Sequence, residues 1–327
     1  MHRKMYRLIR HYRLYLLIPV IIILISGCSS NSKQQGEHIS ETRLLLDTYC
    51  TITIHGDVDS ELLDEAFMLC GELEALLSMT IEGSDVWRIN FADGGNLLID
   101  PRTYQVIEAG LAFGEISGGL FDINIGRLTR LWDFGSGDNY VPSEAEINKA
   151  SAESVWIDLG AIAKGYIADM IIMFLVDRGV TGAMVDLGGD VVTLGNRSDG
   201  DPWRIALRRP FGSLEDWIGV IEVSGQAVVS SGVYERSFEK EGNFYHHILD
   251  PGTGMPVKTD VVSATVIAES ALIGEGLSTI AVLVGSDKAL AYFEQNTGFL
   301  GAVLVLDSGE ILRFGDLNFI DFADENR

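Results

Sequence analysis

The sequence predicts an α+β fold with mixed, mainly antiparallel sheets and packed helices. Segments with helical and strand periodicity follow one another irregularly, which favours this class over a doubly wound parallel sheet. The 327 residues are 47% hydrophobic and 22% charged, enough to bury the core of one large or two closely joined domains. Several of the 36 glycines cluster beside predicted strands, where they indicate tight turns.

The individual elements follow from the spacing of apolar residues and from their bounding turn residues. Pro101 stands where a helix can begin, and Gly118-Gly119 stand where that helix ends. We expect strands at 43–55, 154–159, 182–187, 203–208, 218–223, 226–231, 244–249, 261–268 and 302–313, and helices at 59–77, 102–117, 165–178, 270–284 and 287–295.

Residues 1–27 have the composition of a targeting segment rather than of the fold. Five basic residues precede a 12-residue apolar run, Leu14 to Ile25, which is too short for a membrane span of about 20 residues but suits a signal peptide. Ile25-Ser26-Gly27-Cys28 resembles the lipobox of bacterial lipoproteins. We therefore expect residues 1–27 to be a lipoprotein signal peptide, Cys28 to be lipidated, and residues 28–42 to form a polar tether. The chain would be extracytoplasmic and lipid-anchored to the membrane; an ordinary signal peptide with an accidental cysteine is the alternative.

The charge of the chain limits its partners. The leader carries five basic residues and no acidic one, so the formal net charge of the remainder is −28 rather than the −23 of the whole chain. Such a body is unsuited to nucleic acid and repels anionic ligands, so a phosphate site would need a local cation. Cys50 and Cys70 lack zinc-type spacing. They are expected to be small buried hydrophobes, and a disulfide between them remains open.

Four glycine-bearing stretches carry the chemical information: 118–135, 158–170, 229–257 and 271–279. Neither the Walker A pattern nor the dinucleotide fingerprint occurs in the sequence. Small residues still allow backbone amides to approach phosphates, and Lys164 opens a predicted helix whose N-terminus is electropositive. A lysine in that position, taken alone, is more often simply solvated.

Taken together, these stretches resemble the ApbE family of FAD:protein FMN transferases over roughly residues 44–305. The family patterns Gly-x-Phe-Asp and Leu-Trp-x-Phe-Gly are met at 119–122 and 131–135, and Asp-Leu-Gly-x-Ile-x-Lys-Gly-Tyr is met at 158–166. Ser-Gly-x-Tyr-Glu-Arg is met at 231–236, and His-Ile-x-Asp-Pro-x-Thr-Gly at 247–254. The resemblance implies a T-fold-like domain over 43–320.

The resemblance also implies a reaction, a metal and partners. FAD would be the substrate, and its FMN half would pass with the help of Mg²⁺ to a Thr or Ser hydroxyl of an acceptor redox protein, releasing AMP. The ligands of Mg²⁺ would be the carbonyl of Ala161, the carboxylate of Glu275 and the hydroxyl of Thr279. Glu275 departs from the family, which has Asp there. Further departures are Leu46-Asp47 in place of Met-Gly, and Val233 in place of Asp.

The remaining site residues also come from the family motifs. His247 is expected to accept or relay the hydroxyl proton, while Asp250 either orients it or caps the following turn. Asp158 is expected at the adenine or ribose, and Lys164 at the pyrophosphate or as a brace for its loop. Phe121, Tyr234 and Tyr245 are candidate ring contacts. The full set expected at the flavin nucleotide is Leu46, Leu120, Phe121, Asp122, Asp158, Lys164, Ser231, Tyr234, His247 and Ile248.

Two alternatives to protein flavinylation stay open. An FAD pyrophosphatase would use water in place of the protein hydroxyl and give FMN and AMP. A non-catalytic FAD-binding lipoprotein is the other alternative, and the substitution at Glu275 is the feature that keeps it open.

Overall fold

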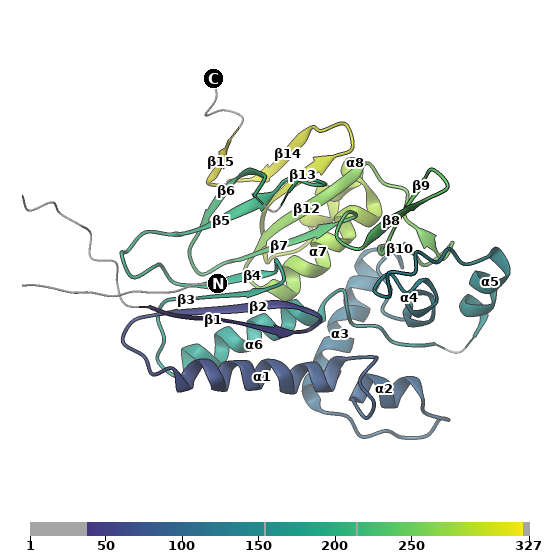
Figure 1. The fold of residues 1–327 in the computed structure, drawn as a ribbon, viewed down its shortest axis with the longest axis horizontal. Helices are drawn as coiled ribbons and strands as arrows, with labels where there is room; N and C mark the ends of the chain where they lie inside the picture. The colour runs from purple at the N-terminus through teal and green to yellow at the C-terminus, as the bar shows by residue number, and fades with distance from the viewer. Residues whose placement is uncertain (1–37, 154, 214, 323–327) are drawn as a thin grey trace, which may run out of the picture. The chain divides into compact units, whose positions relative to one another are not determined.

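A computed structural model describes residues 38–153, 155–213 and 215–322, and its centre is an eight-stranded antiparallel sheet (Figure 1). The expected signal peptide and Cys28 lie outside the described residues. The strands of the sheet, in spatial order, are β1 (His38–Leu45), β2 (Thr48–His55), β3 (Ala183–Leu187), β4 (Val191–Leu194), β7 (Ala227–Gly232), β12 (Val261–Ala268), β13 (Phe299–Leu306) and β14 (Ile311–Gly315).

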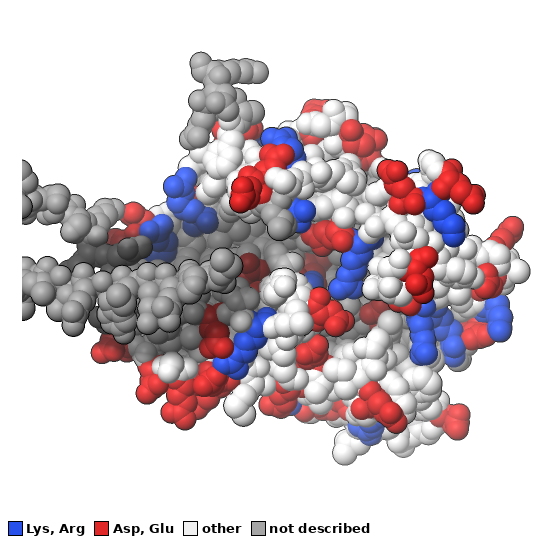
Figure 2. Space-filling view, in the orientation of Figure 1, with Lys and Arg blue, Asp and Glu red and all other residues white. Residues whose placement is uncertain are grey.

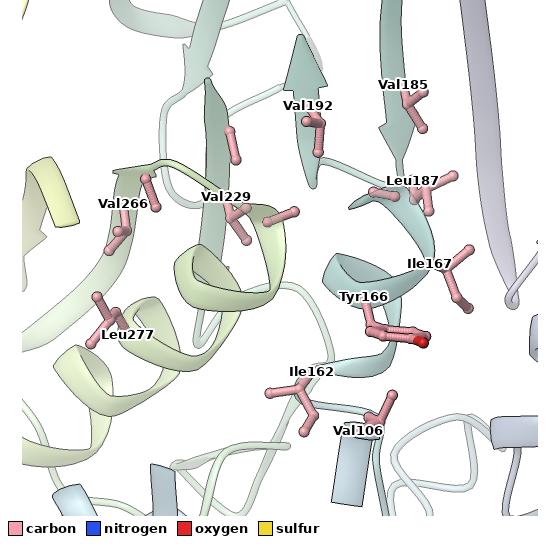
Figure 3. Packing of buried hydrophobic residues seen from close by; sticks show 14 of the residues in the cluster. Val106, Ile162, Tyr166, Ile167, Val185, Leu187, Val192, Val229, Val266 and Leu277 are labelled. Carbon is pink, nitrogen blue, oxygen red and sulfur yellow. The ribbon is translucent and has the colours of Figure 1, made fainter. Parts of the chain in front are cut away.

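Four helices cover one face of this sheet. They are α1 (Glu61–Leu77), α6 (Ala163–Asp177), α7 (Ala271–Val284) and α8 (Ser286–Phe293). Helix α7 packs on β7 and β12, and α6 packs on β3 and β4. Figure 3 shows the resulting core, in which Ile167 of α6 and Leu277 of α7 lie beneath Leu187 and Val229 of the strands. Because α6 and α7 also pack on each other, the segments that carry the glycine motifs meet at one place.

A three-stranded antiparallel sheet covers the opposite face. Its strands are β5 (Trp203–Arg208), β6 (Trp217–Val223) and β15 (Phe319–Asp321). Val228 and Ile267 face this second sheet, whereas their neighbours Val229 and Val266 face the helices. Since side chains alternate along a strand, β7 and β12 are buried on both faces, which explains the consecutive apolar residues at 227–229 and 266–268.

The remaining elements lie beside these layers. They are the helices α2 (Asp85–Asn90), α3 (Pro101–Ile116), α4 (Gly126–Trp132) and α5 (Glu144–Ala152), and the two-stranded pairs β8 (Ser237–Lys240) with β9 (Asn243–His246) and β10 (Leu249–Asp250) with β11 (Met255–Pro256). The predicted α+β class with mainly antiparallel sheets is confirmed.

Several element predictions were wrong at chain reversals. The single strand expected at 43–55 is the hairpin β1–β2, which turns at Leu46 and Asp47 with φ of 55° at both residues. Left-handed backbone is unusual for Leu46, which continues the apolar pattern, so the pattern concealed the turn. The strand expected at 302–313 is the hairpin β13–β14, and that at 244–249 is divided between β9 and β10. Strand β1 begins at His38, so residues 38–42 are paired in the sheet rather than belonging to a tether.

The strand expected at 154–159 was also wrong, because only a single bridge pairs Trp156 with Ile125. Cys50 and Cys70 are both fully buried and unlinked, as expected for small hydrophobes. Within the described ranges, no helix has the length and apolar character needed to cross a bilayer.

Candidate active site

A cavity of about 510 Å³ lies where the β1–β2 turn, the loop before α4, the start of α6, the end of β7 and helix α7 converge. Twelve of the fourteen residues predicted for the site line it. They are Leu46, Leu120, Phe121, Asp122, Asp158, Ala161, Lys164, Ser231, His247, Ile248, Glu275 and Thr279. The fold therefore brings together residues that are distant in the sequence.

The close packing of α6 on α7 fixes one wall of the cavity. The carboxylate of Asp169 on α6 accepts hydrogen bonds from the amides of Ala271 (2.8 Å) and Leu272 (3.0 Å) at the start of α7. Gly165 lies against the same turn, since a Cβ built on it would be 2.5 Å from the carbonyl oxygen of Ala271. The two helices can approach this closely only because residue 165 has no side chain.

Lys164 holds two carboxylates at the floor of the cavity. Its Nζ donates to Asp190, which follows Gly188-Gly189, and to Glu275 of α7. Burial alone would lower the pKa of Lys164, but the two carboxylates raise it above its ordinary value. Lys164 thus links the start of α6 to α7 and to the turn before β4, and its expected contact with the pyrophosphate stays a prediction.

Glu275 is almost fully buried, and both of its oxygens have partners. One oxygen accepts from Lys164, and the other accepts from the amide of Gly165 at 2.7 Å. Burial raises the pKa of Glu275 to about 7, with Lys164 opposing the shift and Asp190 adding to it.

Thr279 lies one turn further along α7. Its hydroxyl is 3.2 Å from the hydroxyl of Ser231 on β7, and Ser231 is also 2.7 Å from Ser278. Ser231 and Thr279 line the cavity, whereas Ser278 is fully buried behind them.

His247 presents a neutral imidazole to the cavity. Its backbone amide donates to the carbonyl of Arg236 at 3.1 Å, while its ring atom Nδ1 is buried without a hydrogen-bond partner among the described residues. Burial lowers the pKa of His247 to about 4, and the positive charge of Arg236 adds to the shift. The ring is therefore unprotonated at neutral pH, and one of its two nitrogens carries a lone pair that can accept a proton.

The comparison with known proteins connects this cavity to a family. The sequence model of the ApbE family matches residues 46–304. The chain belongs to the ApbE family. An FAD:protein FMN transferase of Klebsiella pneumoniae is 33% identical over 288 residues, covering 80% of this chain and 89% of that protein. One from Treponema pallidum is 29% identical, covering 87% and 89%.

Solved structures of the ApbE family have the same fold. The ApbE protein of Thermotoga maritima superimposes with a TM-score of 0.78 at 33% identity, covering 85% of this chain and 97% of that one. Flavin transferase ApbE from Vibrio cholerae gives a TM-score of 0.74 at 26% identity, covering 85% and 97%.

The Mg²⁺ implied by the ApbE resemblance fits the donors in the cavity. In a regular first turn, the amide of Gly165 would bond the carbonyl of Ala161; here it donates to Glu275 instead. No hydrogen bond from the described residues reaches the Ala161 carbonyl oxygen. This carbonyl, the Thr279 hydroxyl and the Glu275 carboxylate are hard oxygen donors of the kind Mg²⁺ prefers. The described residues hold no cluster of three His, Cys, Asp or Glu side chains suited to a metal, consistent with a site that uses few carboxylates.

Two residues expected at the ApbE site lie elsewhere. Asp250 does not line the cavity; its Oδ1 accepts from the amide of Gly252 at 2.8 Å, so the turn cap is the role that the structure shows. Tyr234 also lies outside the lining, because its ring packs over Gly232, where a Cβ would be 2.4 Å from a ring carbon. Tyr245, an alternative ring contact, instead stacks on Phe238. Phe121 does line the cavity and packs against Phe113.

Sequence reasoning missed several charged residues of this ApbE cavity, among them Asp190, Glu235 and Arg236. These three residues could have been predicted from the sequence. Asp190 directly follows Gly188-Gly189, and the other two lie inside the Ser-Gly-x-Tyr-Glu-Arg match. Solvent reaches Glu235 through the cavity, yet surrounding protein raises its pKa to about 7 by burial, and the charge of Asp190 adds to the shift.

Proposed function

We propose that this protein transfers the FMN half of FAD to a Thr or Ser hydroxyl of an acceptor protein and releases AMP. The observation that carries the proposal is that one cavity collects twelve of the predicted site residues, from segments between Leu46 and Thr279. Membership in the ApbE family and the similarity to FAD:protein FMN transferases over most of both chains support it.

The reaction needs an attacking hydroxyl, an anionic substrate held in place and a proton acceptor. The hydroxyl oxygen would attack the FMN-side phosphorus, a new P–O bond would form, and the bond to the AMP phosphate would break, so that AMP leaves with the bridging oxygen. His247 is neutral and lines the cavity, so one of its ring nitrogens can accept the hydroxyl proton. Lys164 contributes a fixed positive charge near the developing negative charge.

We propose Ala161, Glu275 and Thr279 as the residues that hold Mg²⁺. When bound, the ion would stabilise negative charge on the phosphoryl oxygens. To bind the ion, Glu275 must use oxygens that also accept hydrogen bonds from Lys164 and Gly165. Its longer side chain is thereby already held at the cavity floor by two donors.

Product analysis tests the proposal. The purified full chain is incubated with FAD and Mg²⁺, with and without a Thr-bearing acceptor protein, and AMP and protein-bound flavin fluorescence are measured. AMP together with flavin covalently bound to the acceptor supports transfer. AMP and free FMN at the same rate with and without acceptor would indicate the pyrophosphatase, and FAD binding without AMP would indicate a non-catalytic binder.

Thr279→Ala tests the metal assignment. We expect AMP release to be lost while FAD binding is weakened but retained, because the hydroxyl is one of only a few ligands. Thr181→Ala, at an exposed position outside the cavity, is the matched control and keeps full turnover. Unchanged turnover in Thr279→Ala would refute the assignment.

We also propose that the protein is lipid-anchored at Cys28 and acts outside the cytoplasm. The support is the basic leader, the short apolar run and the small residues that end at the cysteine. Radiolabelled palmitate should enter the wild-type protein and not Cys28→Ala. Equal labelling of the two would refute lipidation at this residue.

A further inference from the structure

A second pocket, of about 460 Å³, lies between the end of α2, helix α4 and helix α5. It combines an aromatic side chain, Trp156, with the basic residues Arg127, Arg130 and Lys149. Acidic side chains dominate the face shown in Figure 2, and a group of basic side chains gathers where α4 and α5 lie. The three basic residues of the pocket outnumber its two acidic ones, Glu146 and Glu153, although the body carries a formal net charge of −28.

Trp156 has an unused hydrogen-bond donor. The residue is only 8% exposed, and its indole Nε1 is buried without a partner among the described residues. The guanidinium carbons of Arg127 and Arg130 lie 4.5 and 5.1 Å from its ring centroid, so the ring is held in place by two cations. Because buried polar groups are nearly always hydrogen-bonded, the free N–H indicates an absent acceptor.

The acidic residues of the pocket are already paired. Glu153 accepts from Arg127 at 2.8 Å and lies 3.9 Å from Lys149, and Glu146 accepts from the hydroxyl of Tyr140 at 2.6 Å. Arg130, in contrast, is exposed and forms no ion pair within the part of the chain that the structure describes. The groups of the pocket that lack an acidic partner are therefore hydrogen-bond donors, and such donors suit a ligand with anionic oxygens.

Arg130 connects this pocket to the active site, because it lines both cavities. A group bound beside Arg130 would lie at the edge of the flavin cavity. The pocket is open to solvent, which suits one side chain of a larger partner better than a small ligand that must be enclosed. The acidic surface elsewhere repels a negatively charged partner, so this patch is where such a partner is favoured to dock.

On the basis of the proposed transferase function, we propose that the Trp156 pocket binds an acidic side chain of the acceptor polypeptide. The carboxylate of the acceptor would meet Arg130 and Lys149, and a small shift of the surrounding side chains would let it reach the buried indole N–H. The hydroxyl of the acceptor would enter the neighbouring flavin cavity. The pocket would thus contribute to the choice of acceptor rather than to the chemical step.

Direct binding of defined peptides to the full chain tests this inference. The probes are two fluorescein-labelled peptides that each contain one Thr and differ only in carrying three Asp or three Asn residues. We expect the Asp peptide to bind at least tenfold more tightly at low salt, with the difference shrinking as salt is added. Equal affinities of the two peptides would overturn the proposal.

A double variant identifies the pocket. Lys149→Gln with Trp156→Phe removes one charge and the unused N–H but keeps an aromatic ring, and it should weaken binding of the Asp peptide about tenfold. The control, Lys288→Gln with Trp217→Phe, makes the same changes at exposed positions on α8 and β6 and should bind like wild type. Equal effects of the two double variants would overturn the proposal.

Two further measurements separate this inference from the proposed function and from a free-phosphate site. FAD binding, followed by flavin fluorescence, should be the same in wild type and in both double variants. If wild type did not bind FAD, the proposed transferase function would be refuted, whereas the result of the peptide experiment would still stand. Displacement of the Asp peptide by inorganic phosphate or AMP as readily as by unlabelled peptide would show that the pocket takes free phosphate, and would overturn the acceptor proposal.

Discussion

Gly165→Ala is the substitution for which the structure makes the sharpest stability prediction. The added Cβ would be 2.5 Å from the carbonyl oxygen of Ala271, about 0.9 Å closer than ordinary van der Waals contact, and 2.8 Å from the amide nitrogen of Leu272. These are backbone atoms at the start of α7, so no change of rotamer relieves the contact. Overpacking of this kind costs about 1–3 kcal/mol. Because the clash also displaces the amide that bonds Glu275, we expect a net loss of about 2 kcal/mol.

Gly71→Ala is the matched control. Gly71 lies inside α1, and a Cβ built there has no atom within 4 Å. The helix propensity of alanine should therefore stabilise the protein by about 0.5–1 kcal/mol. Urea unfolding, followed by circular dichroism without FAD, measures both variants. A Gly165→Ala protein as stable as wild type would refute the close approach of α6 and α7.

Three further predictions concern the charged groups of the cavity. Because burial lowers the pKa of His247 to about 4, unfolding takes up a proton between about pH 4 and 6.5. The stability from this group is fully present above that window, and about 3 kcal/mol is lost as the pH falls through it. The free energy of urea unfolding in His247→Asn should lack this slope, and parallel pH profiles would contradict the assignment. Lys164→Met leaves Asp190 and Glu275 without their cation, which should cost about 3–5 kcal/mol at pH 7. The cost should be smaller at pH 5, because burial raises the pKa of Glu275 to about 7 and the group is protonated there. Thermal melts at both pH values measure this, and a pH-independent loss would argue against it. Removal of divalent ions with EDTA should stop AMP release but leave the melting curve unchanged, because Lys164 already compensates charge on the cavity floor. A lowered melting temperature would show that the metal is part of the fold.

The sequence predicted the buried strands and long helices well, because their apolar patterns extend over many residues. Reversals were harder to predict, and the turn at Leu46 and Asp47 shows why. Both residues adopt left-handed backbone without the glycine or asparagine that usually marks such turns. The short α2, α4 and α5 were missed because two turns of helix carry too little periodicity to detect.

The site was predictable where glycine motifs define backbone and lining together, as at 158–166. It was less predictable where a side chain could point either into the cavity or toward the neighbouring backbone. Tyr234 lies inside a matched motif, yet its ring closes over Gly232 instead of entering the cavity. Asp250 could have faced His247, but the amide of Gly252 is nearer along the chain and takes its carboxylate. Local turn geometry decided both cases, and motif spacing does not report it.

The walls of the flavin cavity come from both ends of the folded body, from the turn at Leu46 to Leu283 near the end of α7. A ribosome must therefore release nearly the whole polypeptide before any of it can hold the dinucleotide. A nascent chain therefore cannot bind FAD during its synthesis. A chain that crosses a membrane unfolded likewise carries no bound FAD. Such a protein draws its flavin from the compartment in which it folds.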